Sequence, residues 1–522
     1  MSRISRLVLV NFKKFEFLTL DFETGMNVLI GDNEAGKSSV LLAMDLAMSA
    51  SRNRVESLGV ESLLSLAAIK TFQEGDRSPE SLPCITVDIF LEEGENQELN
   101  GNQNAEHRLS DGLRMIVAPL IQEYGEDIKA LLEQNQDNFP YEYYTVKFYT
   151  FSGAPYASFK RYIKHLMLDN SRIDSSYAAR EYIRTVFNLR VPVAERYKLE
   201  SSYRHGKKLF REEHLTTINK ALGPYQFDVR TTSNSNLETD LDLTQEGISL
   251  LNRGKGQQCF IKTEFALGKQ EAKGDLDVML LEEPENHLSF NNMKKLVKGL
   301  SSADNTQLFI ATHSSHICSR LDLRHALMLG PDHSVLNLKG LSPETANFFM
   351  KAPDNNILEF ALSKKVILVE GDAEFILLEA LYKTLSGGIS PENDSVHIIS
   401  IGGTSFKRYL ELAKLLGICA AVIRDNDGDY EKNCVLNYQE YIGDNAKIFF
   451  DTNNSRSTFE ICLYQDNQAI CEELFAPGRK TLTVQEYMLS NKAEVAFELL
   501  NKKATNLTVP EYIQEAVQWI RL

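Results

Sequence analysis

The N-terminal part of the chain alternates short apolar runs with polar breaks. Residues 6–12, 17–22, 26–31 and 84–91 are runs rich in β-branched and aromatic side chains, which favour strands. Between them, the apolar residues of 38–51 recur at the spacing of a helix face. This pattern predicts an α/β domain in which several strands pack around one helix.

The pattern changes its character three times further along the chain. Residues 95–234 begin with a loop-like stretch and continue as a polar, irregular segment rich in helical spacing, so we expect a helical insertion there. Residues 235–355 return to strands and helices, and their near-continuous apolar strands suit a parallel sheet covered on both faces. We therefore predict one split domain, 1–94 with 235–355, that is interrupted by the insertion.

A second alternation of strands and helices begins after residue 360. The expected strands are 365–371, 397–403, 419–425 and 446–451, and the expected helices between them include 373–385 and 405–417. Short strands separated by helices form parallel sheets. Residues 356–522 are therefore predicted to form a second, smaller α/β domain.

Composition narrows the class of protein. The 522 residues are 43% hydrophobic and 25% charged, close to the average of globular proteins, and suffice for roughly three structural units. The net charge of -16 argues against a protein coated in positive charge, so nucleic acid would have to bind a local patch. No apolar run approaches the length of about 18 residues that a membrane span needs, and the N-terminus lacks the apolar block of a signal peptide. We expect a cytoplasmic protein without a membrane partner, and its 7 scattered cysteines should be reduced.

Residues 31–38, GDNEAGKS, match the phosphate-binding pattern GxxxxGK[ST] between an expected strand and an expected helix. In such a loop the backbone N–H groups close around phosphates, Lys37 reaches the β- and γ-phosphate oxygens, and the Ser38 hydroxyl binds Mg²⁺. An ordinary glycine turn is the alternative, which the flanking strand and helix disfavour. We predict an ATP site whose nucleotide contacts come from Asn33, Gly36, Lys37, Ser38 and Ser39.

The second half of an ATP site is an apolar strand that ends in carboxylates, and residues 278–288, VMLLEEPENHL, have this form. We assign Glu282 to the Mg²⁺ ion and Glu283 to the attacking water. His313 ends the next expected strand, where it would contact the γ-phosphate. A packed histidine without a catalytic role is the alternative.

These two motifs, separated by a long insertion, resemble the ABC-type ATPases of the structural-maintenance and DNA-repair class. In that class a signature loop from a second subunit closes over the γ-phosphate. Residues 251–258, LNRGKGQQ, occupy the corresponding place, with Gly254 and Gly256 as the expected nucleotide contacts. The loop departs from the usual Ser-Gly-Gly order, so a simple loop stays the alternative. The resemblance implies a homodimer with two composite ATP sites.

Acidic side chains follow the expected strands of the C-terminal domain. Glu370 ends a strand, and Glu374 follows on the first helical turn, so both carboxylates can face the same space. Asp425 and Asp427 form a D-x-D pair after another strand, and Glu460 comes after the last one. Hard oxygen ligands in this number suit Mg²⁺ or Mn²⁺, and two such ions can activate water and stabilise a leaving phosphodiester oxygen. Taken singly, each would more often be a solvated loop residue or a helix cap.

The ordered set Glu-Gly-x-x-Glu, Ser400–Gly403 and Asp-x-Asp resembles the Toprim fold of topoisomerases, primases and overcoming-lysogenization-defect (OLD) nucleases. An N-terminal ABC ATPase with a dimerisation insertion, followed by a Toprim domain, is similar to the architecture of OLD-family nucleases. The resemblance implies that Lys492 is the cation that stabilises the pentavalent phosphate. Lys480 is the alternative. It also implies that the metal ligands are Glu370, Glu374, Asp425, Asp427 and Glu460.

The segment 160–211 is the most basic part of the chain, with thirteen Lys and Arg residues against five Asp and Glu residues. Tyrosines at 162, 177, 182, 197 and 203 are interleaved with them. Positive charge with aromatic side chains is typical of a surface that binds a nucleic-acid backbone and stacks on bases. A solvated helix face or the rim of a subunit interface is the alternative.

These observations lead to the hypothesis of a metal-dependent DNA endonuclease gated by an ABC-type ATPase dimer. The family resemblance further implies a setting in anti-phage defence, as in Gabija-type systems, or beside a retron reverse transcriptase with its RNA-linked DNA. A first alternative is an ATP-dependent clamp or sensor whose Toprim domain binds nucleic acid without cutting it. A second is a primase-like or topoisomerase-like enzyme with the same metal site. Analysis of the reaction products separates these hypotheses.

Overall fold

The structure, a computed structural model, describes residues 2–94, 96–134, 138–169, 176–220, 222, 225–229, 237–267, 276–301, 306–330, 334–351 and 356–522. Contacts divide the chain into two compact units. The first is Met1–His313 with Leu327–Val335, and the second is Ser314–Ala326 with Leu336–Leu522. Among the described helices, none combines the length and apolar character needed to cross a membrane.

The first unit contains an antiparallel sheet with the strand order β2-β1-β4-β6-β5, and β7 pairs with β6. The strands are β1 (Ile4–Phe12), β2 (Phe15–Asp21), β4 (Ile85–Leu91), β5 (Asn100–Gly101), β6 (Ser110–Pro119) and β7 (Tyr144–Thr150). Apolar side chains from these strands, such as Leu7, Ile89 and Met115, are completely buried in the core of the unit. The strands expected at the N-terminus are therefore present and bury the apolar positions of the pattern.

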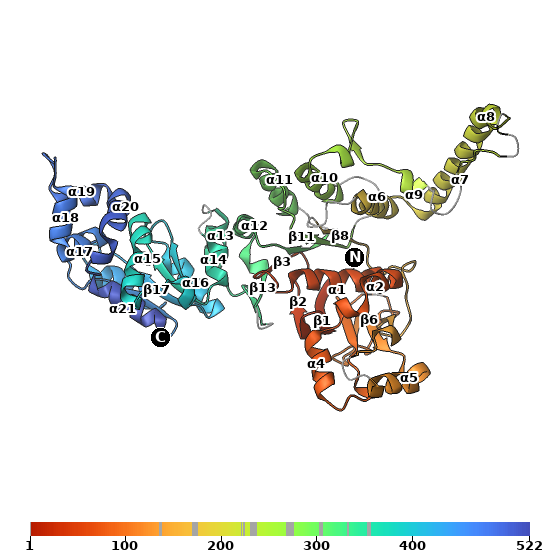
Figure 1. Cartoon of the computed structure of the whole chain (residues 1–522), viewed down its shortest axis with the longest axis horizontal. Coiled ribbons are helices and arrows are strands. Elements are labelled where there is room, and N and C mark those ends of the chain that lie inside the picture. The colour runs from red at the N-terminus through yellow and green to blue at the C-terminus, as the bar shows by residue number, and fades with distance from the viewer. Residues whose placement is uncertain are drawn as a thin grey trace. The chain divides into compact units, whose positions relative to one another are not determined.

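A second sheet has the order β14-β13-β3-β12-β11-β8. Its strands are β3 (Met26–Ile30), β8 (His165–Asp169), β11 (Val278–Glu282), β12 (Gln307–Ala311), β13 (Ala326–Leu329) and β14 (Val335–Asn337). The neighbours β3, β12, β11 and β8 run parallel, and β11 and β12 are buried almost throughout, as their apolar runs predicted. Helix α1 (Lys37–Ser49) packs against strands of both sheets (Figure 1).

The expectation of a helical insertion over 95–234 is wrong for its first half, because β6 and β7 extend the antiparallel sheet and β8 extends the parallel one. The strand β6 looks polar because it contains Arg114, whose guanidinium donates two hydrogen bonds of 2.6 Å to Asp88 on β4. Asp88 is completely buried. A charge pair hidden inside the sheet therefore disguised a core strand as a polar segment, and residue 94 does not divide the fold.

The first unit contains further helices around the sheets. They are α2 (Arg52–Leu58), α3 (Val60–Leu63), α4 (Leu66–Glu74), α5 (Ile121–Gln134), α6 (Ser176–Arg190), α7 (Val193–Phe210), α8 (Thr216–Lys220), α9 (Leu237–Asp240), α10 (Lys255–Leu267) and α11 (Phe290–Ser301). The short strands β9 (Thr244–Gln245) and β10 (Ile248–Ser249) form a hairpin. Within the described residues of the predicted insertion, helical structure thus dominates from Ser176 to Lys220.

The second unit is built on a parallel sheet with the order β16-β15-β17-β18, which confirms the predicted small α/β domain. Its strands are β15 (Lys365–Val369), β16 (Val396–Ser400), β17 (Cys419–Ile423) and β18 (Ala446–Phe449). Its helices are α12 (Ser315–Arg320), α13 (Pro343–Lys351), α14 (Ile357–Leu362), α15 (Asp372–Ser386), α16 (Phe406–Leu416), α17 (Phe459–Asp466), α18 (Gln468–Phe475), α19 (Val484–Ser490), α20 (Lys492–Lys503) and α21 (Glu511–Arg521). The unit includes Leu336–Lys351, so it begins before the boundary predicted at residue 356.

Candidate functional site

The loop 31–38, which we call the phosphate loop, connects β3 to α1. Gly36 caps α1 with a φ of 101°, a conformation that other residues rarely adopt. A Cβ atom on Gly36 would lie 2.3 Å from the Phe15 ring, and one on Gly31 would lie 2.7 Å from the carbonyl oxygen of Leu329. Both glycines of the motif are therefore required by the close packing of this turn.

The side chain of Lys37 is buried and folds back over the phosphate loop. Its Nζ donates hydrogen bonds to the carbonyl oxygens of Gly31, at 2.7 Å, and of Asp32, at 3.1 Å. Asn33 and Ser38 are exposed, and Ser39 is half-buried. The loop therefore combines a helix N-terminus, an exposed hydroxyl and a lysine that lies folded over it, the groups that bind phosphate and Mg²⁺.

The strand register aligns the other predicted ATP-site residues with this loop. In the three neighbouring parallel strands β3, β12 and β11, Leu29 pairs with Ala311, and Ala311 pairs with Glu282. The residues that follow these strands therefore leave the sheet at one edge. The phosphate loop begins at this edge of the sheet. Glu283 and His313 lie at the same edge, as the sequence predicts.

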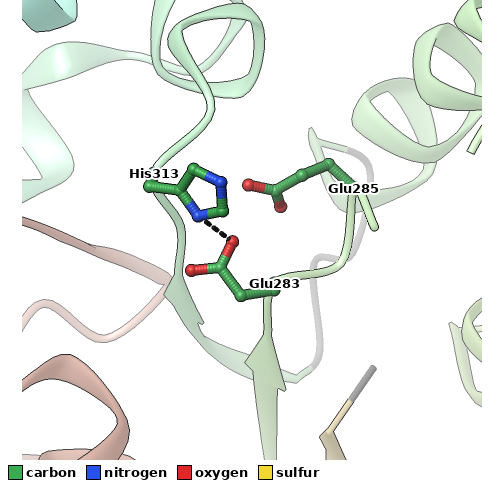
Figure 2. Close-up of side chains that lie close together, drawn as sticks. All are labelled: Glu283, Glu285 and His313. Atoms are coloured by element: carbon green, nitrogen blue, oxygen red, sulfur yellow. Dashed lines mark ion pairs between the residues drawn. The ribbon is translucent and has the colours of Figure 1, made fainter. Parts of the chain in front are cut away.

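Glu283, Glu285 and His313 come together beyond the strand ends (Figure 2). The Nδ1 atom of His313 lies 2.5 Å from Oε2 of Glu283. Glu285 points toward them from the loop after β11, and its Oε1 accepts a hydrogen bond from the Thr312 hydroxyl. The sequence analysis missed Glu285, although the repeated carboxylates of the E-E-P-E stretch were its signal.

Burial and the negative charge of Glu283 raise the pKa of Glu285 to about 7, against the hydrogen bond from Thr312. Among the described residues, Glu283, Glu285 and His313 can place ligand atoms within 4.8 Å of one another. Oε2 of Glu283 is buried and paired with His313, and Oε2 of Glu285 is buried beside that pair. These three residues can therefore hold a proton or a cation between them. Glu283, the residue assigned to the attacking water, is one of the three.

The predicted signature loop, 251–258, runs into α10, which begins at Lys255 and therefore includes its second half. A Cβ atom on Gly256 would lie 2.0 Å from the carbonyl oxygen of His287, in the loop after β11. Gly254 is exposed, and a Cβ atom there would meet nothing within 4 Å. Gly256 is thus fixed by contact with its own unit, whereas Gly254 faces outward.

The second unit gathers the predicted carboxylates at the carboxyl end of its sheet. Glu370 follows β15 and Asp425 comes two residues after β17, and these two strands are parallel neighbours. Glu374 lies on the first turn of α15, and Glu460 lies on the first turn of α17. We call these four residues, with Asp427, the carboxylate site.

Three of these carboxylates are buried, and burial raises the pKa of several members of the site. Glu460 is 2% exposed, Glu374 8% and Asp425 9%, whereas the Asp427 side chain is 53% exposed. Burial and the charges of Glu374, Glu370 and Glu460 raise the pKa of Asp425 to about 8. Burial, opposed by Arg424, raises the pKa of Glu370 to about 7, and burial also raises the pKa of Glu374. The carboxylates thus interact closely enough to disfavour one another's charge.

Two cations contact the carboxylate site. Lys492, the first residue of α20, places Nζ 2.9 Å from Oε2 of Glu460. Burial lowers the pKa of Lys492, but Glu460 outweighs it, so that pKa lies above its usual value. The second cation, Arg424, was not predicted, and its Nη1 lies 3.2 Å from Oε1 of Glu370. Lys480, the alternative to Lys492, lies in the segment between α18 and α19.

The carboxylate site fits a divalent cation. Oε1 of Glu370 and Oε2 of Glu460 are buried and contact Arg424 and Lys492, and the buried Oε1 of Glu460 has no hydrogen-bond partner. Buried carboxylate oxygens favour a positive ion beside them. The described carboxylates of this site are not among the groups whose ligand atoms all lie within 4.8 Å, so an ion would draw them closer together.

Family models match both units. A model described as the overcoming lysogenization defect protein-like Toprim domain matches residues 362–427. An AAA domain model matches residues 6–147, and an AAA ATPase domain model matches residues 156–318. The chain is an OLD-like ATPase–Toprim protein. The carboxylate site therefore belongs to an OLD-like Toprim domain, and the phosphate loop belongs to its ATPase part.

Solved structures are similar to parts of this OLD-like chain. The C-terminal region of the Xanthomonas campestris pv. campestris OLD protein shares 19% identity over 31% of this chain and 95% of that one, with a TM-score of 0.22. The C-terminal region of the Burkholderia pseudomallei OLD protein shares 18% sequence identity, and the match covers 31% of this chain and 98% of that one, with a TM-score of 0.24. The SMC head domain from Thermotoga maritima shares 12% sequence identity, and the match covers 62% of this chain and 94% of that one, with a TM-score of 0.30. The search of curated proteins found no match.

A buried asparagine shapes the D-x-D loop of the Toprim domain, and the sequence analysis missed it. Asn426 is 1% exposed, and its Nδ2 donates to the carbonyl oxygens of Asp451, at 2.7 Å, and Asn453, at 3.1 Å. Its Oδ1 accepts from the Gly428 N–H at 2.8 Å. Asp427 has a φ of 50°, which this network supports. The signal for this role was the D-N-D-G order, which is typical of a tight turn.

The basic segment 160–211 of this OLD-like protein differs from its predicted form. Tyr182 is buried and donates a hydrogen bond to the carbonyl oxygen of Lys262, so it cannot stack on bases. Tyr162 and Tyr203 donate hydrogen bonds to acidic side chains. Tyr197 on α7 is 67% exposed, and the side chain of Tyr177 lies outside the described residues. The segment thus offers positive charge with fewer free aromatic side chains than expected.

Proposed function

We propose that this OLD-like protein is a metal-dependent DNA endonuclease regulated by an ABC-type ATPase dimer. The observation that supports it most is the group of buried, mutually interacting carboxylates at the carboxyl end of the Toprim sheet, with Lys492 beside them. A purely structural site would not gather so many carboxylates with so few cations, because their repulsion costs stability.

The proposed cleavage takes place at the carboxylate site. Mg²⁺ or Mn²⁺ would be held by Glu370, Glu374, Asp425, Asp427 and Glu460, and would supply an activated water and a stabilised leaving oxygen. The Lys492 ammonium, held by Glu460, is placed to neutralise the charge that develops on the phosphate. The buried Asn426 keeps the two aspartates of the D-x-D loop in position.

The proposed ATP site uses residues that converge on the phosphate-loop edge. Lys37 and Ser38 would contact the phosphates and Mg²⁺, with Glu282 as a further ligand of the ion. Glu283 would orient the attacking water, and its contact with His313 fixes the carboxylate in place. Asn33, Gly36 and Ser39 would complete the nucleotide contacts from the loop and the first turn of α1.

The remaining parts of the proposal concern partners. The exposed Gly254 and the neighbouring Gly256 would face the nucleotide of a second copy, so that a homodimer forms two composite sites. The basic helices of 160–211 would contact the DNA backbone. We propose a cytoplasmic setting in anti-phage defence, with a retron reverse transcriptase and its RNA-linked DNA as a candidate partner.

The test is the conversion of supercoiled plasmid to nicked or linear DNA. Wild-type protein, Glu370→Ala and the surface control Glu515→Ala are each incubated with Mg²⁺ or Mn²⁺, with and without ATP. We expect cleavage by the wild type and the control, and its loss in Glu370→Ala, because that variant lacks one of the carboxylates of the proposed cleavage site. The comparison with and without ATP then shows whether the nucleotide activates or inhibits cleavage.

Two outcomes would contradict the endonuclease proposal. If Glu370→Ala cleaves as fast as wild type, the cleavage does not come from the Toprim carboxylates. If wild type and Glu370→Ala are equally inert under every condition, the protein does not cut DNA on its own. The clamp or sensor that binds nucleic acid without cutting it would then be the better account.

A further inference from the structure

The Toprim site contains a buried cation at the level of its first carboxylate. Arg424 follows β17 directly, and its side chain is only 7% exposed. Because β15 and β17 are parallel neighbours in register, Glu370 and Arg424 stand at the same level at the ends of adjacent strands. Nη1 of Arg424 lies 3.2 Å from Oε1 of Glu370, and Nη2 donates a hydrogen bond of 3.5 Å to Oδ2 of Asp427.

Aromatic rings line the pocket that holds this guanidinium. Its central carbon lies 5.9 Å from the centroid of the Phe406 ring and 5.5 Å from that of the Tyr438 ring. Both rings are buried, and ring faces stabilise a desolvated cation. Nε of Arg424 is buried without a hydrogen-bond partner, and Nη1 contacts the Glu370 carboxylate as an ion pair. Charge and ring contacts therefore hold the guanidinium, as they would hold a simple ion.

Arg424 forms ion pairs with one group of the Toprim carboxylates, Glu370 and Asp427. The second group is Glu374, Asp425 and Glu460. The charges of this second group act on one another, on Lys492 and also on Glu370. A two-metal site needs both groups free to bind divalent ions. Here the carboxylates of the first group already face the positive charge of Arg424. This charge is permanent because arginine stays protonated in proteins.

We propose that Arg424 takes the place of one of the two cations, so that this Toprim site holds a single divalent ion on Glu374, Asp425 and Glu460. The inference rests on the metal-dependent function proposed above and specifies how its site works. The guanidinium repels a second divalent ion from Glu370 and Asp427 because the charges would lie within a few ångströms of one another in a poorly solvated place. During cleavage, Arg424 supplies a fixed positive charge beside the phosphodiester while the single ion activates water.

The experiment counts Mn²⁺ ions bound to the full-length protein, in the absence of nucleotide, from the electron paramagnetic resonance signal of free Mn²⁺. The double variant Glu374→Gln/Asp425→Asn serves as the blank, so that ions bound at the ATPase site cancel. We expect wild type to bind one ion per chain more than the blank. Arg424→Gln, which removes the guanidinium charge, should bind two more than the blank. Arg424→Lys keeps the charge and should bind one more.

The results that would overturn the inference differ from those that would overturn the proposed function. Wild type binding two ions more than the blank, or Arg424→Gln binding only one more, shows that Arg424 does not replace a metal ion. Wild type binding no more ions than the blank overturns the metal-dependent function as well. Thermal unfolding of each variant shows that the ions are counted on folded protein, and the wild-type and Arg424→Lys counts decide the inference even if Arg424→Gln unfolds.

Discussion

Glu285 lies where the proposed ATP chemistry would be most sensitive to a neighbouring group. Its buried carboxyl approaches Glu283 and His313 and is anchored by the Thr312 hydroxyl. Because its pKa is raised to about 7, Glu285 can keep a proton at neutral pH. We interpret Glu285 as a positioning residue that holds the Glu283 and His313 pair in one geometry.

The substitution Glu285→Gln tests this interpretation. Glutamine keeps the shape and can still accept from Thr312, but it cannot share a proton with Glu283 or take up a charge. We expect ATP hydrolysis to slow by about 10- to 100-fold, the range for groups that support a catalytic residue, while ATP affinity changes little. Steady-state hydrolysis and nucleotide-binding titrations measure the two quantities separately.

The control is the exposed Glu80→Gln, in the same unit, which should hydrolyse ATP at the wild-type rate. A Glu285→Gln protein with unchanged hydrolysis would show that the proton of Glu285 is irrelevant. Weaker ATP binding with an unchanged turnover would also contradict the interpretation, because a residue that positions the water should act on turnover.

At the scale of elements, α10 and the loop after β11 are in direct backbone contact. Residues on either side of this contact belong to the predicted signature loop and to the carboxylate strand of the ATP site. The contact requires glycine at position 256, because a Cβ atom would lie 2.0 Å from a backbone oxygen of His287. The two elements must therefore shift together, which links the outward-facing Gly254 region to Glu283 and Glu285.

The pair of variants Gly256→Ala and Gly254→Ala tests this link between elements. Gly256→Ala should destabilise the protein by about 1–3 kcal/mol, the usual cost of overpacking, and should lower ATP hydrolysis. Gly254→Ala adds the same methyl group where nothing lies within 4 Å, so it should change stability by less than about 0.5 kcal/mol. Chemical denaturation measures both. Equal effects of the two substitutions would show that the His287 contact does not matter.

At the scale of the whole molecule, the two proposed sites lie in different units with separate hydrophobic cores. The core of the first unit surrounds α1 and both of its sheets, and the core of the second surrounds α15 and the parallel sheet. The described residues assigned to the ATP site all belong to the first unit, and those assigned to the carboxylate site all belong to the second. A substitution that removes one chemistry is therefore expected to leave the other site intact.

Lys37→Ala and Asp425→Asn test this separation. Lys37→Ala should abolish ATP hydrolysis, because the ammonium that neutralises the phosphates is lost, yet it should bind as many ions at the Toprim site as wild type. Asp425→Asn should lose DNA cleavage and retain ATP hydrolysis in the absence of DNA. Both activities and the Mn²⁺ count are measured on each protein. Loss of ATP hydrolysis in Asp425→Asn would show that the sites depend on one another for folding.

The sequence by itself determined the elements that depend on local pattern and short motifs. The phosphate loop, the strand that ends in Glu282 and the parallel strands of the second unit follow from hydrophobic period and from residues adjacent in the chain. The Toprim carboxylates could be predicted as a group because the carboxyl ends of parallel strands meet at one edge. Glu283 and Glu370, which follow such strand ends, could therefore be predicted as members of the two candidate sites.

Only the tertiary structure decided which buried charges meet. Asp88 and Arg114 pair across strands and so hid a core strand inside a polar segment. The contacts of Glu285 and Arg424 come from burial and from partners distant in sequence, Thr312 for Glu285 and Glu370 for Arg424. Tyr182, a stacking residue by its surroundings in the sequence, is buried. Whether a polar side chain is solvated or desolvated depends on the packing of distant segments, and a local pattern contains no information about that packing.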